Sequence, residues 1–159
     1  MIETTLILIK PDGVQRQLTG RIIQRFEAVG LKIVGMKMAW ADAEFAKKHY
    51  AAHLNKKFYA GLEQFITEGP VIAIALQGLH AVELVRKIVG STEPRTAQPG
   101  TIRGDFAHHS YEASDQKGKS VRNLVHASGT KKEAEEELNL WFNKKEIYNY
   151  ATVHEKHVF

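Results

Sequence analysis

The sequence predicts an α+β fold in which helices pack on an antiparallel sheet of four strands. Short apolar runs rich in β-branched residues alternate with segments of helical spacing, and glycines and prolines separate the two kinds of segment. The resulting order is β-α-β-α-α-β-α-loop-β-α, which is typical of a sheet covered by helices. The length of 159 residues fits one domain with a substantial core, so we expect residues 1–159 to form a single domain.

The first strand is predicted at residues 4–9, an apolar run that the proline and glycine of residues 10–13 should close as a rigid turn. Residues 18–29 carry apolar residues at helical spacing, and Gly30 ends this helix. Hydrophobicity then alternates over residues 31–40, which indicates the second strand.

Two short helices are predicted next, at residues 43–52 and 59–67. A glycine and a proline then open an apolar strand at residues 71–76. Residues 80–89 again show helical spacing, and Gly90 stops that helix.

Residues 91–103 contain two prolines and a glycine and are predicted to form a long ordered loop. A second, polar loop is expected at residues 107–121, and the last strand and the last long helix at residues 121–126 and 131–142. A βαββαβ core of this kind is the ferredoxin-like arrangement, with helices on one face of the sheet. That arrangement hosts many unrelated functions and therefore names none of them.

The composition excludes several classes of protein. No apolar run is long enough to span a bilayer, the N-terminus lacks the features of a signal peptide, and the chain has no cysteine for disulfides or thiol chemistry. These features favour a cytoplasmic protein that binds no membrane. The formal net charge of +4 suits a polyanionic partner, either a nucleic acid or a smaller polyphosphate.

His126 follows the apolar pair Leu124-Val125, which places its imidazole at the end of a buried strand. Ser128 comes two positions later, and Glu137 lies about two turns into the next helix, from where its carboxylate can return toward the strand end. An imidazole beside a hydroxyl and a carboxylate is a candidate nucleophile or general base. A single histidine in such a place is more often a satisfied core residue, so this segment alone leaves both readings open.

Residues that suit phosphate are spread along the chain. Two arginines and a lysine that meet at one cavity would clamp a polyphosphate, because guanidinium forks match phosphate oxygens, and amides or hydroxyls would add neutral hydrogen bonds. Each charge taken singly is better explained as a solvated surface residue, and the glycine-rich loop of P-loop proteins is absent. The candidates are Lys10, Arg86, Thr92, Arg103 and Asn123.

His49 and His53 lie four residues apart on a predicted helix, which is a spacing that metal ligands use. The sequence offers no evident third ligand, so we expect both on a partly exposed helix surface. No protein ligand for a metal is predicted.

Several motifs, spread in order over essentially the whole chain, resemble those of the nucleoside diphosphate kinase family. They are Lys10-Pro11-Asp12-Gly13-Val14, His49-Tyr50, Phe58, Gly69-Pro70-Val71, Arg86, Gly90 with Thr92 and Pro94, the PGTIRGDF run at residues 99–106, Arg122-Asn123, His126-Ala127-Ser128 and Leu140-Trp141-Phe142. The number and order of these motifs make the resemblance highly specific. The longer segment at residues 107–121 is similar to that of archaeal-type members.

The resemblance implies a ping-pong phosphotransferase, in which His126 takes the γ-phosphate of a nucleoside triphosphate and passes it to a nucleoside diphosphate. It implies that Ser128 and Glu137 orient His126, and that Phe58 stacks on the base with Leu62 beside it. Further side chains would hold the transferring phosphate or the ribose hydroxyl, namely Lys10, Tyr50, Arg103 and Asn123, or the other phosphates, namely Arg86 and Thr92.

The resemblance also implies Mg²⁺ held mainly by the nucleotide phosphates, and a homo-oligomer, a hexamer more often than a tetramer, with contacts from the loop around Pro94. The chain departs from the family pattern in three places. Gly129 stands where many members have an aspartate near the metal, which puts a protein contribution to Mg²⁺ binding in doubt. Lys57 replaces the usual proline before Phe58, and the segment at residues 107–121 is longer.

Two alternatives belong to other classes of protein. A basic ferredoxin-like module that binds RNA or DNA should display aromatic residues on its sheet, whereas the predicted strands carry mostly aliphatic residues. An inactive homologue kept for its oligomeric surface would share the motifs without the chemistry. Transfer of phosphate from γ-labelled ATP separates these alternatives.

Overall fold

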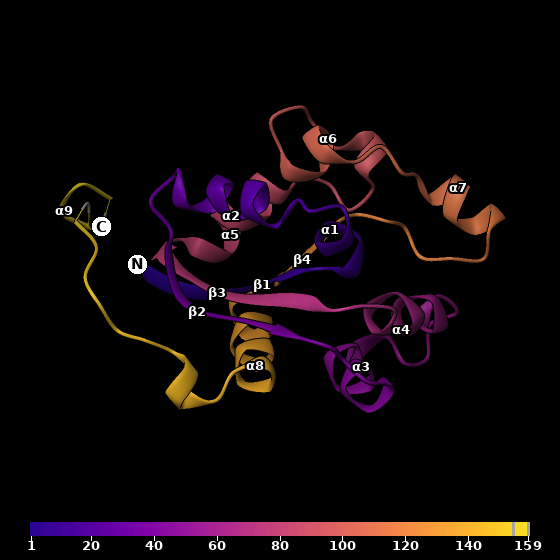
Figure 1. The fold of residues 1–159 in the computed structure, drawn as a ribbon, viewed down its shortest axis with the longest axis horizontal. Helices are drawn as coiled ribbons and strands as arrows, with labels where there is room; N and C mark the ends of the chain where they lie inside the picture. The colour runs from indigo at the N-terminus through magenta and orange to yellow at the C-terminus, as the bar shows by residue number, and fades with distance from the viewer. Residues whose placement is uncertain (154, 159) are drawn as a thin grey trace.

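The computed structural model describes residues 1–153 and 155–158, and its centre is an antiparallel sheet of four strands (Figure 1). The strands follow the spatial order β2-β3-β1-β4 and span Lys32–Ala39, Val71–Leu79, Ile2–Ile9 and Val125–Ala127. Strand β1 is apolar and fully buried over its C-terminal half, and it pairs with β3 along its whole length and with β4 at its end. The predicted four-stranded, ferredoxin-like α+β architecture is confirmed.

Helices cover both faces of this sheet (Figure 1). Helices α2 (Thr19–Glu27) and α5 (Ala81–Val89) lie on one face, and α8 (Lys131–Trp141) lies on the other, in one apolar cluster with α3 (Ala43–His49) and α4 (Tyr59–Thr67). The expectation of helices on one face was therefore wrong. The central strands are covered on both faces, whereas Met36 and Met38 of the edge strand β2 are exposed, and neither of these side chains is an aromatic ring that could stack on a base.

The physical reason for two covered faces is the continuous apolar run of β1. Ile7 and Ile9 pack into the cluster under α2 and α5, whereas Leu6 and Leu8 pack with Trp141 of α8 on the opposite side. Because successive strand residues point to opposite faces, a run without polar residues requires cover on both.

Several predicted loops contain short helices. Residues 10–13 do not form a turn: Lys10 precedes α1 (Pro11–Gln15), which begins at a proline. The loop at residues 91–103 contains η2 (Pro94–Thr96) and ends in α6 (Ile102–Phe106), and the segment at residues 107–121 contains α7 (Tyr111–Gln116). The remaining short elements are η1 (Ala51–His53), η3 (Lys144–Glu146) and α9 (Glu155–Val158). None of the helices in the described residues combines the length and the apolar character needed to cross a bilayer.

The last strand differs most from its prediction, because only Val125–Ala127 belong to the sheet and residues 121–124 do not. Leu124 has a φ of 70°, which a branched side chain rarely adopts. Its N–H donates to Oδ2 of Asp12 at 3.1 Å instead of joining a strand ladder. As a result, His126 lies in the middle of a short strand opposite Leu8 rather than at a strand end.

Candidate functional site

A cavity of about 1270 Å³ is lined by residues of β4, α4, α5 and α7. Almost all of the predicted site residues line it, from segments far apart in the sequence. They are Lys10, Tyr50, Phe58, Leu62, Arg86, Thr92, Arg103, Asn123, His126 and Glu137. Ser128 is fully buried behind this wall, against Glu137.

His126 and Ser128 share one carboxylate. Nε2 of His126 lies 2.7 Å from Oε1 of Glu137, and Oγ of Ser128 donates to Oε2 of the same carboxylate at 2.6 Å. Burial opposes ionisation of Glu137, but the hydrogen bonds from His126 and Ser128 outweigh it and hold the pKa of the carboxyl below its usual value. An ionised carboxylate only accepts hydrogen bonds, so the neutral imidazole carries its proton on Nε2 and keeps its lone pair on Nδ1.

Lys10 lies at the floor of the cavity, where its Nζ donates to Oδ1 of Asn123 at 2.8 Å. The amide nitrogen of Asn123 in turn donates to the carbonyl of Thr92 at 3.0 Å. Burial, together with the positive charge of Arg103, lowers the pKa of Lys10 to about 7. A phosphate in the cavity would offset both causes and favour the charged ammonium.

Arg103, on α6, is also buried, and its guanidinium donates to three backbone carbonyls. These belong to Asn123 at 3.1 Å, Gly90 at 3.0 Å and Val125 at 2.7 Å. Burial lowers its pKa to about 10, so it remains charged at neutral pH. A guanidinium has five N–H donors, and two of the three used here fix the backbone on both sides of Leu124, while the third holds Gly90. Arg103 therefore shapes the site as well as supplying charge to it.

Asp12 is a site residue that the sequence reasoning missed. Its carboxylate holds the Leu124 N–H, and the backbone N–H of Lys10 donates to the Leu124 carbonyl at 2.8 Å. Burial raises the pKa of Asp12, which the nearby charge of Lys10 partly opposes. The only sequence signal was the position of Asp12 in the motif that follows the first strand.

The outer part of the cavity has an apolar side. Phe58 is 55% exposed, and Leu62 lies one turn further along the same segment, half-buried. Tyr50 is buried below them, and burial raises the pKa of its hydroxyl. On the opposite side, α7 and the residues after it come close to α4: a side chain at Gly61 would begin 2.9 Å from Oγ of Ser120. The segment at residues 107–121 therefore forms one wall of the cavity mouth.

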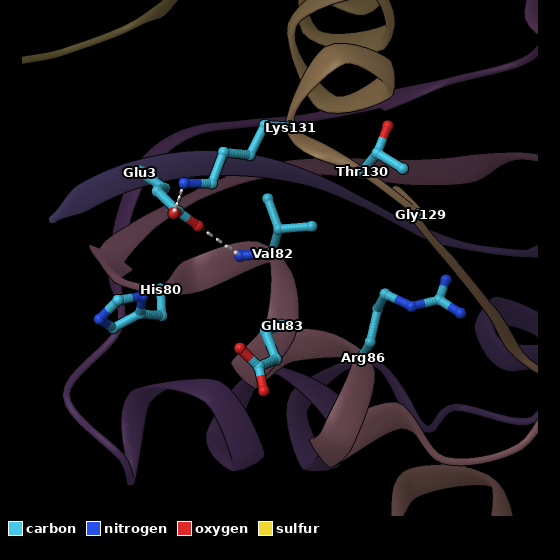
Figure 2. Close-up of a pocket in the computed structure, with 8 residues that line it drawn as sticks. All are labelled: Glu3, His80, Val82, Glu83, Arg86, Gly129, Thr130 and Lys131. Atoms are coloured by element: carbon cyan, nitrogen blue, oxygen red, sulfur yellow. Dashed lines mark hydrogen bonds and ion pairs between the residues drawn. The ribbon is translucent and has the colours of Figure 1, made fainter.

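Arg86 lies at the border with a second cavity of about 380 Å³ (Figure 2). In that smaller cavity the carboxylate of Glu3 contacts Nζ of Lys131 at 2.6 Å and accepts the N–H of Val82 at 3.3 Å. The side chain of Arg86 extends from α5 toward Gly129. Arg86 is exposed and can turn its guanidinium to an anion in the larger cavity.

His49 is not on the helix surface that the sequence predicted. It ends α3 and is only 9% exposed, whereas His53 lies outside α3 and is exposed. Nδ1 of His49 accepts a hydrogen bond from Nε1 of Trp141 at 3.2 Å, and its ring lies against His126. No local pattern indicates this burial, because Trp141 is distant along the chain.

Comparison with known proteins identifies the family of this chain. Residues 3–147 match the model of the nucleoside diphosphate kinase family. A nucleoside diphosphate kinase of Pyrococcus furiosus is 49% identical over 150 residues, which cover 94% of this chain and 89% of that protein. One of Pyrococcus horikoshii is 51% identical over 148 residues, which cover 93% of this chain and 90% of that protein.

Solved structures give the same result. A nucleoside-diphosphate kinase from Borrelia burgdorferi, a transition state mimic with bound vanadate and ADP, matches with a TM-score of 0.95 at 42% identity, over 99% of this chain and 96% of that chain. A halophilic nucleoside diphosphate kinase from Halobacterium salinarum in complex with CDP matches with a TM-score of 0.88 at 39% identity, over 100% and 99% of the two chains. The chain therefore belongs to the nucleoside diphosphate kinase family, which is a family of phosphotransferase enzymes.

Proposed function

We propose that this enzyme transfers the γ-phosphate of a nucleoside triphosphate to a nucleoside diphosphate through a phosphohistidine at His126. The observation that supports this most directly is the pair of His126 and Glu137 at the cavity wall. The pair holds the imidazole in the tautomer that leaves Nδ1 unprotonated, and a neutral imidazole nitrogen is nucleophilic near pH 7. We therefore assign the attack to Nδ1.

In the first half-reaction, Nδ1 forms a bond to the γ-phosphorus, and the bond from phosphorus to the bridging oxygen breaks. The nucleoside diphosphate leaves with that oxygen. In the second half-reaction, a terminal phosphate oxygen of another nucleoside diphosphate attacks the phosphorus, and the imidazole of His126 leaves unchanged. Positive charge develops on the ring as the bond to Nδ1 forms, and the carboxylate of Glu137 stabilises it.

The phosphates would bind along the basic floor of the cavity. Phosphoryl transfer needs little bond-making from the protein, so positioning and charge stabilisation dominate. Lys10 and Asn123 face the transferring group beside His126, with the Tyr50 hydroxyl near them. The unused donors of Arg103 are proposed to serve the same transferring group, and the proposed ligands of the other phosphates are Arg86 and Thr92.

Base binding is proposed to be stacking on Phe58, with little readout of the base edge. Phe58→Ala should weaken the binding of all nucleotides similarly, by roughly 1–3 kcal/mol, because every base has a π-face. Titration with ADP, GDP and CDP measures this, with Tyr148→Ala as a control that removes an exposed ring outside the cavity lining. A large loss for one base with none for another would contradict nonspecific stacking.

A divalent cation is proposed to bridge the nucleotide phosphates, with Mg²⁺ as the metal. The described residues fit such a cation even though Gly129 offers no carboxylate. A side chain at Gly129 would begin 2.6 Å from Oε2 of Glu133, and that oxygen accepts the Gly129 N–H at 2.8 Å. Glu133 thus brings a carboxylate to the place where residue 129 would otherwise supply one, and it lines the cavity. When bound, the cation would neutralise phosphate charge.

Glu133→Gln should therefore raise the Mg²⁺ concentration needed for half-maximal activity by about tenfold. This is the lower end of the effect seen when a group that hydrogen-bonds to the ligands of a metal is lost. The amide can still accept the Gly129 N–H, so helix α8 should remain intact. Glu135→Gln is the matched control, since that side chain is exposed and lies outside the cavity lining. Equal Mg²⁺ dependence of the two variants would contradict a role for Glu133.

We further propose that residues 1–159 act as one cytoplasmic domain within a homo-oligomer, a hexamer rather than a tetramer. Family membership supports this assembly, and light scattering measures it. The segment at residues 107–121 is proposed to act as an entrance or oligomer element. Within it, the N–H of Tyr111 donates to Oε1 of Glu93 at 3.0 Å, and Arg122, the residue that follows the segment, forms an ion pair with Glu68.

A further inference from the structure

Helix α8 presents two side chains, one turn apart, to two neighbouring imidazoles. Glu137 contacts Nε2 of His126 at 2.7 Å, and Trp141 donates its indole N–H to Nδ1 of His49 at 3.2 Å. The two imidazole rings lie edge to face, with centroids 4.8 Å apart and planes at 83°. The four side chains thus form a closed path of contacts that begins and ends on one helix face.

Trp141 decides the tautomer of His49. An indole N–H only donates, so Nδ1 of His49 must offer its lone pair, and the ring proton lies on Nε2. Burial lowers the pKa of His49 to about 3, with the charge of His126 as a further cause, so the ring is neutral. Within residues 1–153 and 155–158, Nε2 of His49 is buried without a hydrogen-bond partner. Such a group is uncommon enough to need an explanation.

A metal site is the first explanation to consider. A ring nitrogen of His49, a ring nitrogen of His126 and a carboxylate oxygen of Glu137 all lie within 4.8 Å of one another. However, a histidine that binds a metal normally donates its other ring N–H to an acceptor. Here Trp141 reverses that arrangement, because it occupies the lone pair of Nδ1 and leaves the proton on Nε2. The neutral His49 ring is therefore a poor ligand.

The alternative to a metal site is a structural role for the His49 ring. One hydrogen bond holds a single atom of His126 but not the orientation of its ring plane. The contact with Glu137 fixes the position of Nε2 of His126, but the imidazole can still tilt about the line from Nε2 to the carboxylate. The edge-to-face contact with His49 removes that tilt. The two contacts together determine where Nδ1 points.

We propose that His49 is a positioning residue for the nucleophile, held by Trp141 so that its ring fixes the plane of the His126 imidazole. This inference rests on the proposed role of His126. His49 touches neither phosphate nor base in this account. Its loss should slow the formation of phosphohistidine while nucleotide affinity stays the same, because in-line attack depends steeply on alignment.

Two variants separate the ring contact from the hydrogen bond. His49→Asn can keep an acceptor for the Trp141 N–H but removes the ring from His126. The double variant His49→Phe with Trp141→Phe keeps an aromatic ring against His126. The second substitution removes the indole N–H of Trp141, which would have no acceptor on a phenylalanine at position 49. Rapid quenching after mixing with γ-labelled ATP should give a rate of phosphohistidine formation about 10- to 100-fold slower in His49→Asn, and close to wild type in the double variant. KM for ATP should change little in either.

Phe45→Leu is the structural control. The ring centroids of Phe45 and Trp141 are 4.7 Å apart, and both residues belong to the same apolar cluster. It should lower the melting temperature without slowing the labelled burst. The inference is overturned if His49→Asn is labelled at the wild-type rate, if the double variant is as slow as His49→Asn, or if slowing follows melting temperature in all variants. A wild-type enzyme without phosphohistidine would instead overturn the proposed function, and this inference with it.

Discussion

His126→Ala should fold and bind nucleotides but form no phosphohistidine, with a loss of turnover of roughly 10⁴- to 10⁶-fold, the range for removal of a covalent nucleophile. The physical reason is that the variant lacks the imidazole whose Nδ1 carries a free lone pair at the cavity wall. The fold should survive, because Glu137 keeps its hydrogen bond from Ser128. Transfer rates and labelling from γ-labelled ATP measure the effect.

His108→Ala is the matched control for this variant, since His108 is exposed and outside the cavity lining. It should be labelled like the wild type. Acid-labile, base-stable label at full stoichiometry in His126→Ala would show that another residue is the nucleophile.

Lys10→Met should lower kcat/KM by roughly 10²- to 10³-fold, the usual effect of removing one preorganised charge donor from a site. Its ammonium is a buried cation that donates to Asn123 and would lie beside the transferring phosphate. Steady-state kinetics with saturating acceptor measures the loss. A variant that keeps wild-type kcat/KM would remove Lys10 from the proposed machinery.

The same variant should be more stable than the wild type in the absence of nucleotide, and the gain should depend on pH. The pKa of Lys10 is about 7 in the folded protein against an ordinary value of 10.5, so between these values the unfolded chain binds more protons than the folded one. Wild-type stability therefore rises with pH across this window, by at most roughly 1.4 kcal/mol per pH unit. Lys10→Met lacks this slope, so its advantage is largest below pH 7 and shrinks as pH rises.

Urea unfolding of both proteins between pH 6 and pH 10 tests this linkage. Arg25→Met is a suitable control for loss of a cation, because Arg25 pairs with Asp105 at the surface and is not part of the cavity lining. A stability difference between Lys10→Met and the wild type that stays constant with pH would contradict the lowered pKa.

The sheet and the central pair of the site could be predicted from the sequence because both depend on local patterns. The apolar run at residues 4–9 identifies β1, and the helical spacing after Thr130 places Glu137 within reach of His126. We did not infer from this run that β1 is buried on both faces. A strand without polar residues requires such burial.

The remaining features depend on contacts between distant residues. Asp12 takes the N–H of Leu124 and so shortens β4, and the three carbonyls bound by Arg103 come from other segments. The burial of His49 depends on Trp141, which packs against it. The spacing of His49 and His53 alone suggests an exposed helix face. No local pattern encodes these contacts, so motif resemblance located the residues without giving their geometry.

The most direct test of the account is a two-step chase on the wild-type enzyme. The protein is incubated with γ-labelled ATP, freed of nucleotide, and then mixed with unlabelled GDP. A phosphohistidine intermediate should give stoichiometric, acid-labile and base-stable label on His126 after the first step, and quantitative transfer of that label to GTP in the second. Labelled GTP that forms only when ATP and GDP are present together, with no labelled protein, would contradict it.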